Sequence, residues 1–174
     1  MVVMNIAIIN TTDKIYLKED FKDGDINIVN TRTLYLKGCN GCFGCWLATP
    51  GLCVQKDNMP EILQTIMNSD LTIYITDVKA GFISSELKKV IDKTIPLMHP
   101  YYNVFQSEMH HKSRYDNFPQ ISLVLIDDKE ISEPVFDIIK NWFTRLSYNN
   151  ATNVRFVIKD DSILGRLNNE VSNY

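Results

Sequence analysis

The four cysteines of the chain lie close together, at Cys39, Cys42, Cys45 and Cys53, with the spacing C-x2-C-x2-C-x7-C. Glycines at 41 and 44 separate the first three and let the backbone turn tightly, so that several thiolates can converge on one centre. Thiolates grouped in this way bind an iron–sulfur cluster or carry out redox chemistry. This segment is therefore the first candidate for chemistry in the chain.

The composition indicates one domain and excludes several partners. A chain of 174 residues with 45% hydrophobic and 22% charged residues suits a single compact domain, residues 1–174. The net charge is -3 and the basic residues are dispersed, which argues against nucleic acid and against an anionic membrane surface. Neither a bilayer-spanning apolar run nor a basic leader is present, so we expect a cytoplasmic protein. In that reducing compartment, clustered cysteines are more often ligands or redox thiols than disulfides.

The elements that must position these cysteines follow from the apolar pattern. Short, nearly continuous apolar runs predict strands buried on both faces, at residues 5–10, 26–29, 71–76, 121–126 and 154–158. Between them, apolar stripes at helical spacing predict helices that begin after Asp57 or Asn58, after Ser84, and after Ser132. This alternation predicts an α/β protein with a five-stranded parallel sheet covered by helices.

One stretch of the sequence resembles a known family. The order strand, Cys-x2-Cys-Phe-Gly-Cys-Trp, Pro-Gly-x-Cys, Asp-Asn-Met, helix, strand, Gly-x2-Ser-x2-Leu-Lys-x2-Ile-Asp-Lys is similar to that of the flavodoxin-like NAD(P)H-dependent FMN reductases and the iron–sulfur flavoproteins. The match covers residues 25 to 95 well and the rest more loosely. The resemblance implies a three-layer flavodoxin-like fold with strand order 2-1-3-4-5 and FMN at the carboxyl ends of the strands.

The resemblance also implies an activity and a set of site residues. Nicotinamide from NAD(P)H would reduce FMN, and FMN would pass electrons to a small acceptor or to a 4Fe-4S cluster. The carried-over residues are Asn10, Thr11 and Thr12 after the first strand, Thr76, Asp77, Val78, Lys79, Gly81 and Phe82 after the third, and Cys39, Cys42, Cys45 and Cys53 as cluster ligands. The family also tends to form dimers, so a homodimer or higher oligomer is expected.

Two departures from the family pattern favour a second hypothesis. Only residues 10–24 separate the first two strands, which leaves the first crossover helix shortened or absent, and Asp13 stands where a phosphate would be repelled. After the third strand, Lys79 and Ala80 replace the aromatic residues that relatives place beside the flavin. The alternative is therefore a divergent, non-catalytic relative that has lost FMN binding and serves as a binding or accessory protein.

The cysteine segment has three further interpretations. The thiols can act as small buried hydrophobes, as in related reductases that lack a cluster. They can form a tetrahedral zinc site, although the second Cys-x2-Cys pair of zinc ribbons is missing. A disulfide between Cys42 and Cys53 or between Cys39 and Cys45 can also form after purification.

Polar and aromatic residues also gather outside the cysteine segment. His110, His111 and Arg114 lie in a polar stretch that we interpret as a solvated loop, with approach to a flavin or nicotinamide site as the alternative. The aromatic stretch from His99 to Phe105 indicates a subunit interface. The acidic pair at 127–128 is read as a solvated turn, and residues 162–171 as a brief final helix. With a short first crossover, one face of the sheet would be thinly covered.

Overall fold

The computed structural model describes residues 4–21, 25–126 and 131–159. Its centre is a parallel sheet of β1 (Asn5–Asn10), β2 (Asp25–Asn30), β3 (Leu71–Lys79), β7 (Gln120–Ile126) and β8 (Val154–Lys159), in the order β2-β1-β3-β7-β8. Counted along the parallel strands, this is the order 2-1-3-4-5, so the predicted topology is confirmed. A short strand, β4 (Phe82–Ile83), pairs antiparallel with the end of β3.

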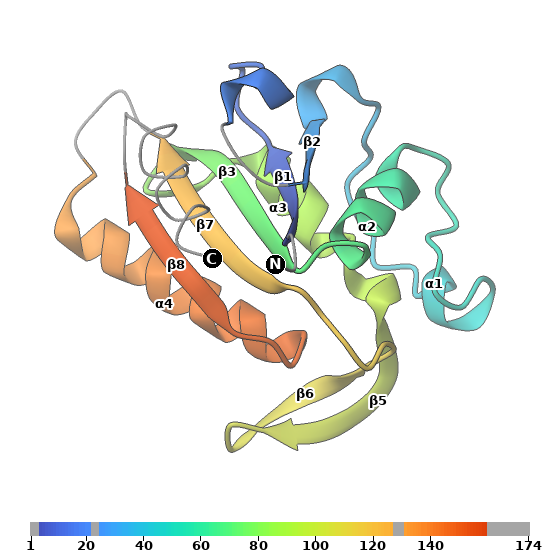
Figure 1. Ribbon diagram of the computed structural model, residues 1–174. Coiled ribbons are helices and arrows are strands. Elements are labelled where there is room, and N and C mark those ends of the chain that lie inside the picture. The colour runs from blue at the N-terminus through green and yellow to red at the C-terminus, as the bar shows by residue number, and fades with distance from the viewer. Residues whose placement is uncertain (1–3, 22–24, 127–130, 160–174) are drawn as a thin grey trace.

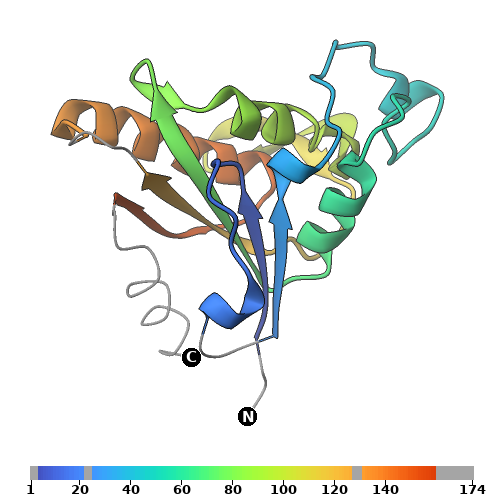
Figure 2. The ribbon, with the colours of Figure 1, turned by 90° about the horizontal axis from the view of Figure 1, so that it is seen from above.

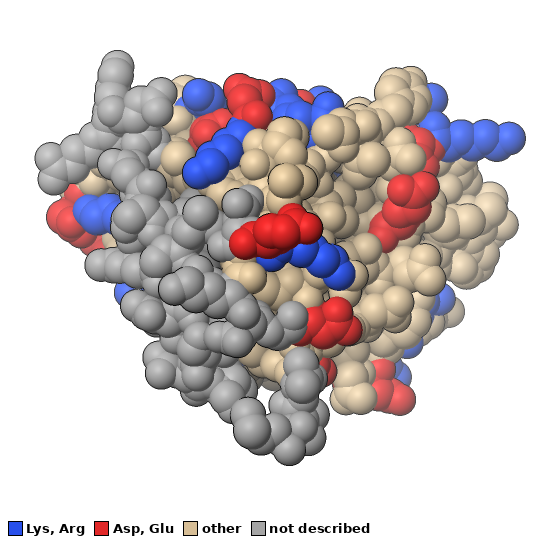
Figure 3. Space-filling model, turned by 45° about the horizontal axis from the view of Figure 1, so that its top comes forward, with Lys and Arg blue, Asp and Glu red and all other residues tan. Residues whose placement is uncertain are grey.

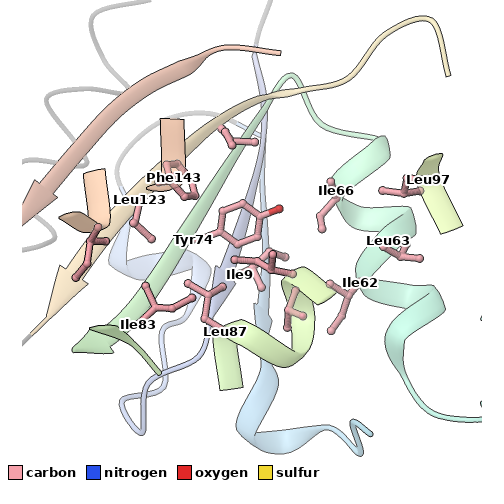
Figure 4. Packing of buried hydrophobic residues seen from close by; sticks show 14 of the residues in the cluster. Ile9, Ile62, Leu63, Ile66, Tyr74, Ile83, Leu87, Leu97, Leu123 and Phe143 are labelled. Carbon is pink, nitrogen blue, oxygen red and sulfur yellow. The ribbon is translucent and has the colours of Figure 1, made fainter. Parts of the chain in front are cut away.

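Three helices cover one face of the sheet: α2 (Met59–Met67), α3 (Ser85–Asp92) and α4 (Glu133–Asn149). Ile62 and Ile66 of α2 and Leu87 of α3 point toward Ile9 and Tyr74 of the sheet (Figure 4). Each helix begins where the sequence predicts. Ser84 accepts a hydrogen bond from the backbone amide of Leu87 and so caps α3, and Pro60 lies in the first turn of α2.

The opposite face of the sheet lacks an α-helix in its first crossover. The described part of residues 11–24 holds only a short 3-10 helix, η1 (Lys18–Asp20), which lies on the other side of β1 and β2 from α2 (Figure 2). Tyr16 and Phe21 pack here against Ile6, Ile8 and other apolar strand residues. Ile6 and Ile8 are buried, whereas Ile28 of β2 and Phe156 and Ile158 of β8 pack against the same cluster and are only partly buried, so apolar surface stays partly accessible at the two outer strands. The predicted final helix at 162–171 and the acidic pair at 127–128 lie outside the described residues.

A β-hairpin replaces the loop that the sequence predicted before the fourth parallel strand. The short 3-10 helix η3 (Ile95–Leu97) leads into β5 (Met98–Phe105), which pairs with β6 (Glu108–Ser113). The hairpin lies beside the end of α4 and apart from the central sheet (Figure 1). Its turn places Gln106 and Ser107 at φ 52° and 63°. These are the paired positive φ values of a tight hairpin turn, here without a glycine.

The segment between β2 and α2 carries the cysteines. It contains the 3-10 helix η2 (Thr31–Thr33) and the four-residue helix α1 (Gly44–Leu47), and it extends beyond α2 at the side of the molecule (Figure 1). None of the helices among the described residues is long and apolar enough to span a membrane.

Candidate functional site

The carboxyl ends of β1 and β3 bring two of the three predicted groups of site residues together. Thr11 follows β1 and donates its backbone amide to the carbonyl oxygen of Ile75 in β3, at 2.9 Å. Its hydroxyl donates to the same oxygen, also at 2.9 Å. Thr76 of β3 donates its hydroxyl to Ser84 Oγ at 2.9 Å. The polar groups at this edge of the sheet are therefore buried and hydrogen-bonded to one another.

The loop after β1 is closed by the side chain of Asn10. Its Nδ2 donates to the carbonyl oxygen of Lys14, and its Oδ1 accepts from both the backbone amide and the hydroxyl of Thr12, at 3.1 and 2.8 Å. The same Nδ2 reaches Asn30 Oδ1 of β2 at 2.8 Å. Asn10, Thr11 and Thr12 are at most 3% exposed. The backbone amide of Thr11 is thus engaged by Ile75 of β3 and that of Thr12 by Asn10, so neither is free to donate to a ligand.

Charged side chains surround this loop with alternating sign. Arg32 lies 3.1 Å from Asp13 and 3.9 Å from Glu86, and Glu86 lies 2.7 Å from Lys89. In Figure 3, which brings the top of Figure 1 forward, acidic and basic side chains are interspersed rather than gathered into patches of one sign. Arg32 therefore already pairs with Asp13 at the surface, while Glu86 pairs more closely with Lys89 than with Arg32.

The loop after β3 is a tight hairpin. β3 ends at Lys79. Ala80 and Gly81 then turn the chain, with φ values of 50° and 77°, and β4 runs back along the end of β3. Phe82 packs edge-on against Trp142 of α4, with ring centroids 4.9 Å apart. Its ring therefore serves the contact between β4 and α4, while Asp77 and Val78 are half-buried and Lys79 is exposed.

These contacts test whether the edge fits FMN. The fold binds a flavin phosphate through free backbone amides at the start of the first crossover helix. Here the described part of the crossover has no such helix, the backbone amides of Thr11 and Thr12 already donate within the protein, and the loop carries the acidic residue Asp13. The described residues do not fit the phosphate of FMN in that way.

The cysteines lie in an exposed segment folded tightly on itself. Cys39 and Cys42 are exposed, Cys45 and Cys53 are half-buried, and all four are free thiols. The interpretation of the thiols as buried hydrophobes is therefore wrong for Cys39 and Cys42. A Cβ at Gly44 would lie only 2.6 Å from Val54 Cγ1, so glycine allows the two ends of the segment to approach.

The thiols influence one another without forming a ligand set. Burial raises the pKa of Cys45, and the neighbouring Cys53, Cys39 and Cys42 raise it further. A thiol with a raised pKa carries less thiolate, the form that binds metal and attacks electrophiles. Among the described residues, no three His, Cys, Asp or Glu side chains are arranged to hold a metal ion. The geometry therefore gives no support to an iron–sulfur cluster or a zinc site.

A buried ion pair anchors the cysteine segment to the helices. The carboxylate of Asp57 accepts hydrogen bonds from Lys93 Nζ, from the backbone amide of Lys37 at 2.9 Å and from that of Met59 at 3.1 Å. The Asp57 and Lys93 side chains are 0% and 1% exposed. Burial alone would raise the pKa of Asp57, but these hydrogen bonds outweigh it and lower the pKa below its usual value. The sequence indicated only that Asp57 or Asn58 precedes a helix. It did not indicate the pairing of Asp57 with Lys93, because no local pattern links residues 36 positions apart.

Aromatic rings join the cysteine segment to the hairpin. Phe43 stacks on Trp46, with centroids 5.4 Å apart, and His111 lies between Trp46 at 4.9 Å and Tyr102 at 4.5 Å. Trp46 also donates its indole N–H to the carbonyl oxygen of Met98 at 3.0 Å. This row of rings fixes the hairpin beside α1.

The histidines and Arg114 are structural parts of the hairpin, so their interpretation as a solvated loop is wrong. His110 is 8% exposed and its Nδ1 lies 2.9 Å from Asn149 Oδ1 at the end of α4. Arg114 donates to the carbonyl oxygens of Pro96 and Met98, at 3.0 and 3.3 Å. The hairpin is held by these tertiary contacts with α4 and η3. Such contacts cannot be predicted from the local sequence of the hairpin.

An apolar patch covers the outer face of the hairpin. It consists of Phe43, Tyr102, Val104 and Met109, which are 54%, 61%, 75% and 72% exposed. Tyr102 pairs with His111, and Val104 with Met109, across the two strands, so these side chains share one face. Exposed apolar surface of this kind is typical of protein interfaces.

Comparison with known proteins shows the fold. No family model and no curated protein matches the chain. An FMN-dependent NADH-azoreductase from Bacillus anthracis, solved with FMN, aligns over 98% of this chain and 99% of its own at 11% identity and a TM-score of 0.60. A putative quinone reductase from Klebsiella pneumoniae aligns over 98% and 83%, at 10% identity and a TM-score of 0.62. The Trp repressor binding protein of Bacillus subtilis aligns over 97% and 95%, at 12% identity and 0.55. At such identities the likeness establishes a flavodoxin-like fold.

Proposed function

We propose that this protein is a divergent relative of the flavodoxin-fold FMN reductases that has lost the FMN phosphate site and acts by binding a ligand or partner. The observation that carries the proposal is the closed loop after β1. Asn10 is hydrogen-bonded to Lys14 and Thr12, and Thr11 donates to Ile75 of β3, so the donors of these residues are already used within the protein.

The electrostatic surroundings support the same conclusion. A dianionic phosphate at this edge would meet the carboxylates of Asp13 and Glu86. Arg32 would have to leave both partners before it could bind the phosphate. Opening the loop would also break the Asn10 hydrogen bonds, and each buried bond that is left unmade costs about 1–3 kcal/mol.

The second candidate function is electron transfer from NAD(P)H through FMN to a small acceptor. It is favoured by the likeness to solved reductases, one of them with FMN bound, over nearly the whole chain. In that case Asn10, Thr11, Thr12, Thr76, Asp77, Val78, Lys79, Gly81 and Phe82 would surround the flavin after the loop had opened.

Titration with FMN and with riboflavin separates the two functions. Quenching of flavin fluorescence is measured for the wild-type protein and for the variant Asp13→Ser/Glu86→Gln. We expect no saturable quenching by FMN with either protein, because the amides of Thr11 and Thr12 stay engaged after the acids are removed. Saturable binding of FMN that exceeds binding of riboflavin, with reduction of the bound flavin by NADH or NADPH, would establish the reductase and overturn the proposal.

We further propose that the protein forms a homodimer through the apolar patch of Phe43, Tyr102, Val104 and Met109. The patch lies on a rigid hairpin that Arg114 and His110 fasten to η3 and α4. A fixed, exposed apolar surface gains free energy by burial without ordering a flexible segment first.

A further inference from the structure

A cavity of about 390 Å³ lies between the cysteine segment, the ends of α3 and α4, and the hairpin. Its walls include Cys39, Asp92, Met98, His111, Leu146 and Asn150. Binding sites for small molecules have volumes of roughly 300–1,000 Å³, so this cavity suits a small ligand. Ser84 caps the first turn of α3, whereas the cavity adjoins its last turn, so the cavity is separate from the carboxyl edge of the sheet.

Asn150 brings an unsatisfied polar group to this cavity. The residue is only 5% exposed, and its Oδ1 is buried without a hydrogen-bond partner. Its side chain makes no hydrogen bond within the described residues. Buried carboxamides are nearly always hydrogen-bonded, because an unpaired one loses the bonds it makes to water. Oδ1 of Asn150 therefore lacks a partner that a ligand in the cavity can supply.

His111 supplies a second unpaired group at the wall of the cavity. Its Nδ1 is buried without a partner, and its ring is held between Trp46 and Tyr102. Since these rings fix the imidazole, the position of Nδ1 is set before any ligand arrives. A preorganised polar atom beside apolar walls such as Met98 and Leu146 is the usual composition of a specific ligand site.

The charge of the walls narrows the ligand class. None of the described residues that line the cavity is a lysine or an arginine, and Asp92 contributes a carboxylate that is ion-paired with Lys88. An anionic ligand would therefore lack a counter-charge. A carboxamide offers a donor and an acceptor side by side, which a cyclic amide matches with its own N–H and carbonyl.

We propose that this cavity binds an uncharged, planar cyclic amide, whose amide edge pairs with Asn150 and whose ring lies beside the edge of the His111 imidazole that carries Nδ1. The site is independent of the carboxyl edge, so the proposal stands whether or not FMN binds there. Failure of one proposal is distinguishable from failure of the other, because the ligands and the residues that respond are different.

Uracil is a suitable probe because it is a small planar cyclic amide, and 1,3-dimethyluracil is its matched control without N–H donors. Binding is followed by NMR on ¹⁵N-labelled protein, from the side-chain signals of Asn150 and the indole N–H of Trp46. We expect saturable shifts with uracil, and binding weaker by about tenfold for dimethyluracil, as the loss of one hydrogen bond predicts. Uridine monophosphate, which adds a ribose and a phosphate at N1, should bind no better than uracil.

Variants test the assignment of the residues. Asn150→Leu should weaken uracil binding by about tenfold or more, whereas Asn141→Leu, the same change on the exposed side of α4, should leave it unchanged. If Asn150→Leu does not fold, Leu146→Phe, which narrows the cavity, takes its place with the same expectation. Absence of saturable shifts with uracil, equal binding of dimethyluracil, or unchanged binding in the cavity variant would overturn the proposal.

Discussion

Replacement of Lys93 by methionine should destabilise the protein strongly, because it leaves the carboxylate of Asp57 buried without its counter-charge. Methionine retains the length and the apolar part of the lysine side chain, so the change removes mainly the ammonium group. Both side chains are at most 1% exposed, and solvent cannot compensate the loss. Breaking one side of a buried ion pair costs about 3–5 kcal/mol, a large part of the roughly 5–15 kcal/mol that stabilises a domain.

The size of the effect can be converted into an unfolding midpoint. With a urea m-value of about 2 kcal/mol per molar, a loss of 3–5 kcal/mol lowers the midpoint by about 1.5–2.5 M. The backbone amides of Lys37 and Met59 still hold the carboxylate, so the low end of this range is expected. Asp57→Asn should also destabilise, because it leaves the Lys93 ammonium unpaired. The double variant should be more stable than the sum of the single changes predicts.

The pH dependence gives an independent check. The pKa of Asp57 is lowered in the folded protein, so its contribution is present above the unfolded value of about 3.9 and is lost as the pH falls through the folded value. In Lys93→Met the pKa of Asp57 rises, since no ammonium stabilises the carboxylate. The difference in stability between the two proteins should therefore narrow between pH 7 and pH 4.

Urea unfolding followed by circular dichroism at several pH values measures both effects. Alkylation of the cysteines reports on the same contact, because Asp57 also holds the backbone of the segment at Lys37. The reasoning would be refuted by a midpoint shift below about 0.5 M at pH 7, which is less than 1 kcal/mol, or by a stability difference that does not depend on pH.

The remaining predictions concern the hairpin. Ser107→Gly should raise the stability by about 0.5–1 kcal/mol, or about 1–4 °C in the melting temperature, because serine is strained at φ 63°. Ser85→Gly in α3 should instead lower the melting temperature. An unchanged melting temperature for Ser107→Gly would count against strain in the turn. Wild-type protein should sediment as a dimer at low concentration, and the double variant Val104→Glu/Met109→Lys should be monomeric. The control Ile138→Lys, on the exposed side of α4, should remain dimeric. A monomeric wild-type protein would exclude the proposed interface.

The sequence by itself determined the framework of the fold. Apolar runs identified all five parallel strands, because strands buried on both faces need apolar residues at consecutive positions. Ser84 and Pro60 identified the starts of two helices, because capping depends only on neighbouring residues. The short stretch between the first two strands also revealed the missing crossover helix, since chain length limits what can be built.

Only the tertiary structure decided the state of the candidate sites. Asn10 and Thr11 are suitable residues for a phosphate loop, yet their hydrogen bonds to Lys14, Thr12 and Ile75 close it. Likewise, the pairing of Asp57 with Lys93 and the unpaired carboxamide of Asn150 depend on residues far apart in the chain. Periodicity and spacing predict which helices and strands form, because these elements depend on neighbouring residues. Whether a polar group is engaged or available depends on which distant side chain reaches it, and the packing of the fold decides that.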